Sequence, residues 1–143
     1  MKEDAETIVE AFHAAWIIGD VETAMAYCHA DIRVSLHYRD HALPFAGETV
    51  GWEPARRRLY QTAQAWEFLD MRQILTSVTP TVVRSLVPFV MRHKATRAVF
   101  EGTFRHVWTL QDCKVIGFDG YVDIALLKSF LRMIGLPAAK ADA

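Results

Sequence analysis

The second half of the chain places the strongest constraint on the fold. Four segments rich in β-branched and aromatic residues follow one another at 67–79, 82–93, 98–110 and 114–122. Short turn signals separate them, a pattern typical of antiparallel strands joined as a meander. A sheet of this kind buries one face, and helices elsewhere in the chain have to cover it.

Helical periodicity occurs both before and after these segments. Apolar residues recur at the spacing of one helix face, which predicts four helices. The segments with this spacing are 7–18, 21–27, 54–66 and 124–134. Asp20 and Asp123 stand where capping side chains begin a helix, and Pro54 suits a first helical turn.

One more strand is expected between the helices. Apolar residues occupy the even positions of 32–38, as in a half-buried strand, while 40–51 is typical of a loop with a short extended piece. Helices first and strands after predict an α+β domain, with a curved antiparallel sheet wrapped round N-terminal helices. We expect a single domain over 1–143, with its core at 3–134 and a frayed tail at 137–143.

Composition and charge exclude several classes of protein. The chain has 143 residues, of which 52% are hydrophobic and 23% charged, so it is neither a disordered tail nor a charged linker. Its net charge of −1 argues against nucleic acid or a membrane surface as a partner. No cationic segment precedes an apolar stretch, so we expect no secretory signal and a cytoplasmic protein. Cys28 and Cys113 form no metal motif and are expected as buried thiols or as a single disulfide.

The alternation of apolar and polar residues along two predicted strands indicates which face of the sheet each polar candidate occupies. Over 98–110 the even positions are the apolar set, and His106 is the only ionisable residue among them. His106 is either a general acid or base tuned near neutrality by burial, or a core histidine bonded to a backbone carbonyl. The same parity over 114–122 turns Asp119 to the other face, unless a bulge resets the register. Asp119 is therefore either an outward, solvated carboxylate or a base.

Three other polar groupings also require interpretation. Asp70 and Arg72 share a strand face and either orient a water or form a surface ion pair. The motif His37-x-x-Asp40-His41 does not converge two imidazoles as a helix would, so we expect no metal. The run 56–58 is three arginines and is expected to be a solvated helix face. No phosphate or dinucleotide fingerprint occurs, so no cofactor is expected.

Several motifs taken together resemble a known family. Phe12-x3-Trp16-x2-Gly19-Asp20, the strand entry 30–34 and the helix entry 47–51 resemble the start of a SnoaL-like domain. The segments 104–108, 114–116 and 121–125 resemble its terminal hairpin and the helix cap that follows. The resemblance covers roughly residues 3–134 and depends on the order and spacing of these motifs. SnoaL-like domains belong to the nuclear transport factor 2-like superfamily, together with ketosteroid isomerases, polyketide cyclases and limonene epoxide hydrolases.

The resemblance implies a cone with an apolar pocket at its open end and a homodimer formed through the outer sheet face. It also allows a comparison with the residues of a ketosteroid isomerase. The position of that enzyme's proton-shuttling carboxylate corresponds to Leu36, and that of its tyrosine donor corresponds to Phe12. The position of its protonated aspartate corresponds to His106. The base and one donor of that reaction are therefore replaced here.

We expect a protein that binds a small hydrophobic molecule and, if it is an enzyme, a cofactor-independent isomerase or cyclase that acts by proton transfer. The candidate catalytic residues are His106 and Asp119. The expected pocket residues are Phe12, Trp16, Leu36, Tyr38, Leu59, Trp66, Phe104, Trp108 and Phe118. The alternatives are a non-catalytic binding protein for a small apolar metabolite and a dimeric interaction module with a filled core.

Overall fold

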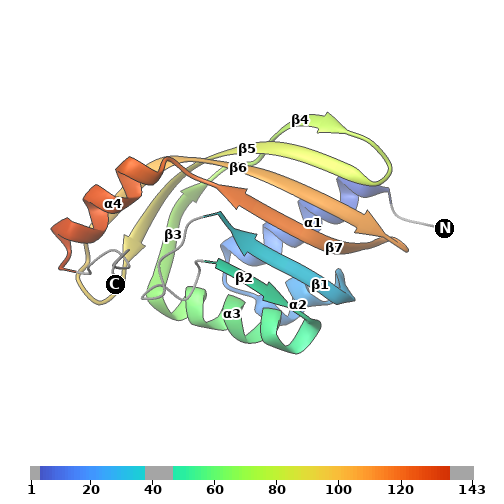
Figure 1. Cartoon of the computed structure of the whole chain (residues 1–143), viewed down its shortest axis with the longest axis horizontal. Coiled ribbons are helices and arrows are strands. Elements are labelled where there is room, and N and C mark those ends of the chain that lie inside the picture. The colour runs from blue at the N-terminus through green and yellow to red at the C-terminus, as the bar shows by residue number, and fades with distance from the viewer. Residues whose placement is uncertain (1–3, 38–46, 136–143) are drawn as a thin grey trace.

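The computed structural model describes residues 4–37 and 47–135. Its helices are α1 (Ala5–Ile17), α2 (Val21–Met25), α3 (Trp52–Ala65) and α4 (Ile124–Met133). Its strands are β1 (Cys28–Leu36), β2 (Gly47–Val50), β3 (Trp66–Met71), β4 (Ile74–Val78), β5 (Val82–His93), β6 (Val99–Gln111) and β7 (Lys114–Tyr121). The long strands β5 and β6 run side by side along the molecule (Figure 1).

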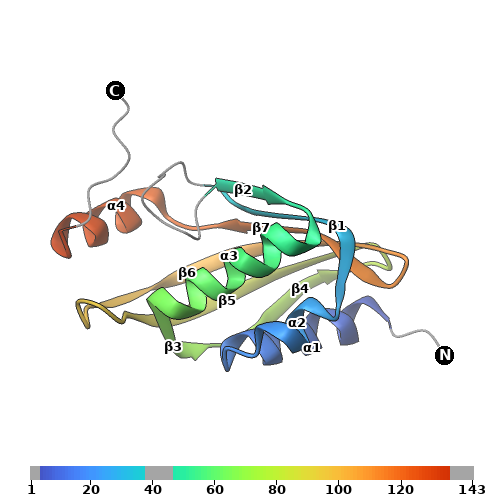
Figure 2. The same ribbon diagram turned by 90° about the horizontal axis from the view of Figure 1, so that it is seen from below.

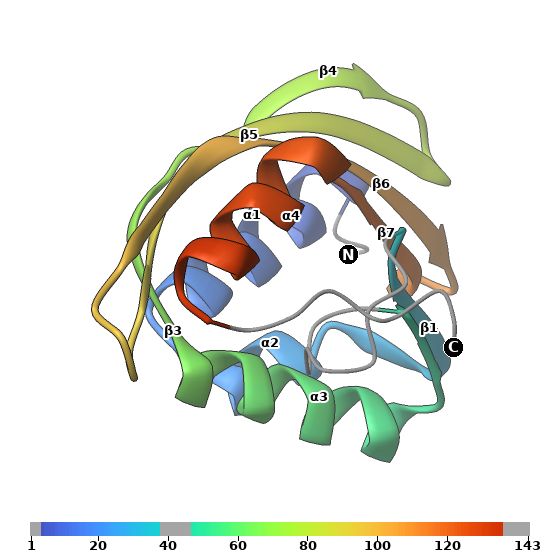
Figure 3. The ribbon, with the colours of Figure 1, turned by 60° about the vertical axis from the view of Figure 1, so that its left-hand side comes forward.

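The described strands form one sheet in the order β2-β1-β7-β6-β5-β3, and β4 pairs with another part of β5. Neighbouring strands are antiparallel except for β1 and β7, which are parallel. The sheet curves around the helices when it is seen from its end (Figure 3). The predicted α+β class is confirmed. The parallel pair departs from the expected antiparallel order because β1 and β7 are far apart in sequence, so no hairpin sets their direction.

The predicted strand 67–79 is two strands rather than one. β3 pairs with the C-terminal part of β5 and β4 with its N-terminal part, and each strand contains a register shift. Between them, the backbone N–H of Arg72 donates to the carbonyl of Pro88 at 3.2 Å. Such irregularities bend a strand, so the edge of the sheet can follow the curve of β5. Composition alone did not reveal the break, because β3 and β4 both pair with β5 and both have the residue types of a strand.

The described helices lie on the concave side of the sheet (Figure 3), and Figure 2 shows α1, α2 and α3 over that face. The inward residues of β6 are the even ones, as predicted: Phe100, His106, Trp108 and Leu110 are buried. α1 packs Ile8, Phe12 and Trp16 into the same core. No helix in the described ranges is long and apolar enough to cross a membrane.

The two cysteines differ in their surroundings. Both are free thiols, and Cys28 is buried while Cys113 is exposed. The expected burial is therefore wrong for Cys113, because it lies in the turn between β6 and β7 with a φ of 60°. Burial raises the pKa of the Cys28 thiol to about 12, so this thiol is protonated and unreactive at neutral pH.

Helix α4 covers one end of the concave face (Figure 3). Leu127, Phe130 and Leu131 are its buried residues, and the Phe130 ring lies 4.9 Å from that of Phe100. Asp123 begins the helix as predicted, since its side chain accepts a hydrogen bond from the N–H of Leu126 at 3.0 Å. The same kind of cap begins α2 at Asp20.

We expect Asp123→Ala to lower the free energy of unfolding by about 1 kcal/mol, because it removes the side-chain cap of α4. Asp123→Asn keeps an acceptor at this position and serves as the matched control, within a few tenths of a kcal/mol of the parent. Urea denaturation measures both changes. Equal losses in the two variants would show that the cap does not stabilise the helix.

Candidate functional site

A cavity of about 80 Å³ lies between the concave sheet face, α1 and α3. Six residues that the sequence predicted for the site line it: Trp16, Leu36, Leu59, Phe104, His106 and Phe118. They come from two helices and three strands, so the cavity depends on the whole fold and not on one local segment. Most of the remaining wall is also apolar, which favours a hydrophobic occupant.

Three predicted pocket residues lie behind this wall and not in it. Phe12 and Trp108 are each 1% exposed and form the layer beneath Phe118. The Trp108 ring stacks on Phe118 at 4.4 Å, and the Phe12 ring meets Trp108 edge-on at 5.2 Å. Trp66, which was expected at the end of a helix, is the first residue of β3 and packs against Phe130 at 5.7 Å. Tyr38 lies outside the described residues.

His106 is the polar candidate that the structure places in the cavity wall. It is 7% exposed, stacks on Phe104 at 5.3 Å and meets Phe118 edge-on at 4.7 Å. Burial, with a smaller contribution from the charge of His13, lowers its pKa from 6.5 to about 3. The expected tuning near neutrality is therefore wrong, because the ring is too well shielded from water to hold a proton. His106 is a neutral imidazole, which can donate one hydrogen bond and accept one.

His13 is a second buried histidine, and the sequence analysis missed it. Its Nε2 lies 2.8 Å from the carbonyl oxygen of Met71, so this nitrogen carries the proton and donates. Burial lowers the pKa of His13, although the hydrogen bond to Met71 opposes the shift. His13 follows the buried Phe12 on α1, and this position was the signal in the sequence for its burial. A buried histidine needs a hydrogen-bond partner, which here is the backbone of Met71.

A short polar chain runs beneath the cavity next to His106. Ser85 is the cross-strand neighbour of His106, and its hydroxyl accepts from the indole N–H of Trp108 at 3.3 Å. The same hydroxyl donates to Oε1 of Gln73 at 3.3 Å. Within the described ranges, two buried atoms have no hydrogen-bond partner, namely Nε2 of Gln73 and Nδ1 of His106. Unsatisfied polar atoms are rare in protein interiors, and their concentration here distinguishes this region from the rest of the core.

Arg58 is the cavity residue that the sequence analysis placed wrongly. It was expected on a solvated helix face, yet it is 5% exposed and lines the cavity. Its Nη1 donates to the carbonyls of Val34 and Gly47 at 2.9 and 2.8 Å. The helical stripe explains this placement, because position 58 lies one turn after Ala55 on the buried face of α3. Burial lowers the pKa of the guanidinium to about 10, so Arg58 still carries its charge at neutral pH.

The other two arginines of this run face outwards. Arg56 forms ion pairs with Glu22 at 2.7 Å and with Glu53 at 3.1 Å, and Arg57 is exposed. For these two residues the expected solvated face agrees with the structure.

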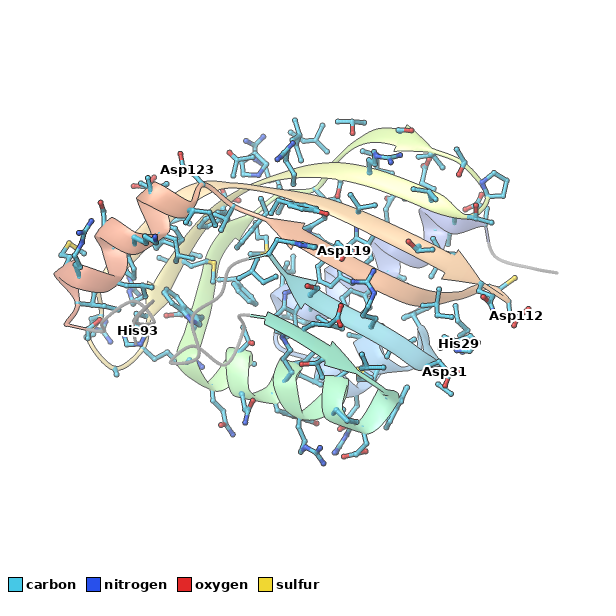
Figure 4. All side chains as sticks on the ribbon, in the orientation of Figure 1. His29, Asp31, His93, Asp112, Asp119 and Asp123 are labelled. Atoms are coloured by element: carbon cyan, nitrogen blue, oxygen red, sulfur yellow. The ribbon has the colours of Figure 1, made fainter. Side chains whose placement is uncertain are left out.

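Asp119, the second catalytic candidate, does not line the cavity. It lies in the middle of β7, well away from the helix cap Asp123 (Figure 4). Its neighbours Phe118 and Gly120 line the cavity, so the side chain of Asp119 belongs to the opposite, convex face. Arg33 holds its two oxygens at 2.6 and 2.8 Å, and Nε2 of His37 lies 3.0 Å from Oδ1. Burial raises the pKa of this carboxyl, but the hydrogen bonds from Arg33 and His37 outweigh that effect and lower it overall. Asp119 lies on the face that the parity of β7 predicts, but the expected solvation is wrong: the residue is 8% exposed, because Arg33 and His37 cover its oxygens.

On the neighbouring strand β1 and just after it, consecutive side chains likewise lie on opposite faces of the sheet. Leu36 lines the cavity, whereas His37 is exposed and stacks on the ring of Tyr121 at 4.2 Å. Asp70 and Arg72 are both exposed, and within the described part of the chain no ion pair joins them. Asp40 and His41 lie outside the described residues. Elsewhere in that part, no three His, Cys, Asp or Glu side chains come together as metal ligands.

Acid is expected to destabilise the protein through His106. Between its folded pKa of about 3 and its ordinary value of 6.5, the unfolded chain binds a proton that the folded chain does not. The free energy of unfolding should therefore fall by about 2 kcal/mol between pH ~7 and pH ~5 because of this residue. His106→Phe should remove that share of the pH dependence, as measured by urea denaturation at both values.

Phe118→Leu is the control for this experiment, because it alters the same wall without removing a titrating group. It should lower stability by a similar amount at both pH values. A pH dependence that is unchanged in His106→Phe would contradict a neutral, buried imidazole.

No family model matches the chain, and no curated protein sequence does either. Many solved structures nevertheless share its fold. A candidate isomerase of Rhodopseudomonas palustris superimposes with a TM-score of 0.80 at 14% identity, over 93% of this chain and 99% of that one. A nuclear transport factor 2-like protein of Burkholderia xenovorans does so with a TM-score of 0.71 at 21% identity, over 89% and 95%.

A candidate polyketide cyclase of Xanthomonas campestris adds a TM-score of 0.72 at 13% identity, over 92% of this chain and 96% of that one. These superpositions cover nearly the whole chain, and all three have low identity. They agree with the seven-stranded curved sheet and the concave helical side described above. The chain therefore has the nuclear transport factor 2-like fold, which SnoaL-like polyketide cyclases and ketosteroid isomerase-like proteins share.

Proposed function

We propose that the protein binds a small, mainly apolar molecule in this cavity and that His106 forms a hydrogen bond to one oxygen of that molecule. The observation that carries the proposal is a neutral imidazole set among aromatic side chains in the cavity wall. An apolar wall with few polar groups is the usual composition of a small-molecule site. The polar group then orients a ligand that the wall holds by burial of apolar surface.

The volume of the cavity limits the size of the ligand. An apolar cavity of roughly 150 Å³ accepts benzene, and this one is about half as large at 80 Å³. A single six-membered ring therefore exceeds the space available and enters only if the wall moves outwards. Met71 and Met91 line the cavity, and flexible thioethers are the side chains best able to move in this way.

Proton-transfer catalysis of the isomerase or cyclase type is the second candidate function. Two donors on the wall favour it, because Arg58 and His106 are of the kind that stabilises negative charge on an oxygen. Solved structures with this fold include a candidate isomerase and a candidate polyketide cyclase. In this reaction the neutral His106 would act as a hydrogen-bond donor to the reacting carbonyl, since a base with a pKa of about 3 removes protons poorly.

A pair of isosteric probes tests the proposed hydrogen bond from His106. Cyclohexanone and methylenecyclohexane have the same shape, but only the ketone accepts a hydrogen bond. We expect His106→Phe to weaken ketone binding by about five- to tenfold with little effect on the hydrocarbon, because only the ketone loses a hydrogen bond. Ligand-observed NMR titration measures both affinities.

Leu59→Phe is the matched control, because it reduces the volume of the cavity and leaves His106 in place. It should weaken the binding of both probes alike. An equal change in the affinities for both probes in His106→Phe would contradict a hydrogen bond from His106. Native mass spectrometry of the purified protein complements the titration by giving the mass of any molecule that copurifies.

The conversion of Δ5- to Δ4-3-ketosteroids should be undetectable. The reaction needs a carboxylate beside the substrate, and in the described cavity wall there is none, since Leu36 occupies the corresponding position. The loss of a general base alone costs about 10²–10⁴ in rate, and a cavity of 80 Å³ does not admit a steroid nucleus. An absorbance assay with a β,γ-unsaturated steroid ketone tests this, with a ketosteroid isomerase as the positive control. Robust turnover by the parent protein would contradict the assigned strand register.

A further inference from the structure

In the described part of the chain, two buried side-chain atoms have no hydrogen-bond partner, and their residues lie in one row across the sheet. The atoms are Nδ1 of His106 and the amide nitrogen Nε2 of Gln73. Ser85 lies between the two residues, because it pairs with His106 on β6 and with Leu75 on β4. Gln73 precedes Leu75 by two positions and therefore shares its face of the sheet. Gln73, Ser85 and His106 thus follow one another on the concave face.

The two ring nitrogens of His106 face opposite neighbours. A Cβ added to Gly120 would lie 3.5 Å from Cδ2 and 3.8 Å from Nε2 of the ring, so this edge faces β7. Gly120 and Leu36 both line the cavity, which places Nε2 on the cavity side. Nδ1 lies on the other edge of the ring and faces β5, where Ser85 is the cross-strand partner. A ligand in the cavity therefore meets Nε2, and Nδ1 is left to the protein.

The direction of the hydrogen bonds in this row follows from Trp108. An indole N–H can only donate, so the hydroxyl oxygen of Ser85 accepts from it at 3.3 Å. The Ser85 hydroxyl then gives its own proton to Oε1 of Gln73, also at 3.3 Å. With Oε1 engaged, the remaining group of the Gln73 amide is its NH₂, which can only donate. The atom that it satisfies must therefore be an acceptor, and Nδ1 of His106 accepts only when it carries no proton.

We propose that Gln73 is a positioning residue that holds His106 in the tautomer with its proton on Nε2. Nε2 of Gln73 and Nδ1 of His106 do not bond each other directly. One buried water connects them, accepting from the amide and donating to Nδ1. The hydrogen bond at one nitrogen of a histidine determines which nitrogen carries the proton. In the opposite tautomer, the amide and Nδ1 would both be donors, and this match would be lost.

The assignment also names the class of ligand, and in that respect it rests on the function proposed above. His106 presents an N–H and no lone pair to the cavity, so it binds an oxygen that accepts, such as that of a ketone, an ester or an ether. A group that can only donate finds no acceptor on this ring. Gln73 sets this preference although it is not part of the cavity wall.

The tautomer is measured in the ligand-free protein by ¹⁵N NMR, because protonated and unprotonated imidazole nitrogens have well-separated chemical shifts. We expect a protonated Nε2 and an unprotonated Nδ1 in the parent protein. Gln73→Glu keeps the shape of the side chain but replaces the donor by an acceptor, so the proton of His106 should move to Nδ1. Both proteins are measured at pH ~9, where a buried carboxyl is ionised even if its pKa is raised, and the imidazole is neutral.

Ligand preference gives a second readout. Cyclohexanone can only accept a hydrogen bond, whereas cyclohexanol can accept or donate. Gln73→Glu should weaken ketone binding by about five- to tenfold and leave alcohol binding nearly unchanged, because the hydroxyl can donate to the lone pair of Nε2. A merely structural role of Gln73 would lower both affinities together. Thr76→Glu is the matched control: this exposed residue of β4 receives the same charge, and the tautomer and both affinities should stay as in the parent.

A proton on Nδ1 in the parent protein would overturn the proposal, whether or not the variant folds. A Gln73→Glu protein that keeps Nδ1 unprotonated would do the same. A tautomer that reverses as expected while neither probe binds would support the role of Gln73 and contradict the function proposed above. The two proposals can therefore fail separately.

Discussion

The pairing of β6 between β5 and β7 determines where every candidate residue of this protein lies. β6 is a strand of thirteen residues whose even side chains are covered by helices. A slip of one residue would move Glu101 and Arg105 into the core, so burial fixes the register strongly. The fixed register places His106 beside Ser85 on one strand and Gly120 on the other. Gly120 has no side chain, and a Cβ there would lie 3.2 Å from a methyl group of Leu36. The space for the cavity beside His106 thus follows from the pairing of three strands.

The sequence predicted those features that depend on strand parity and on local capping. The inward face of β6, the outward position of Asp119 and the cap at Asp123 all follow from alternation or from one side chain beside its own helix. Features that depend on contacts between distant segments were not predictable in this way. The break between β3 and β4, the parallel pairing of β1 with β7 and the buried place of Arg58 belong to this group. For Arg58, a charged residue beside two other arginines is typical of a surface, and its hydrogen bonds to distant segments, among them those to the carbonyls of Val34 and Gly47, are not visible in the sequence.

The buried polar groups around the cavity make this part of the core less stable than an apolar core of the same shape. Arg58 and His13 compensate for their burial through hydrogen bonds to backbone oxygens. His106 has no such bond at Nδ1, and a buried polar atom that no protein group satisfies costs up to roughly 1–3 kcal/mol. Phenylalanine would fill a similar volume without that cost. A side chain that lowers stability, in a wall where apolar residues would suffice, is expected where binding or chemistry requires a polar group.

Adjacent residues of β6 serve two different surfaces. Arg105 points to the convex face and His106 to the cavity, although they are neighbours in sequence. Both residues lie in a stretch that pairs with β5 on one side and β7 on the other, so the backbone there is held by two ladders of hydrogen bonds. A side chain on one face can therefore change without moving the backbone that supports the other face. Alternation in a doubly paired strand thus allows the residues that line the cavity and the residues on the convex face to vary independently, within a single short segment of the chain.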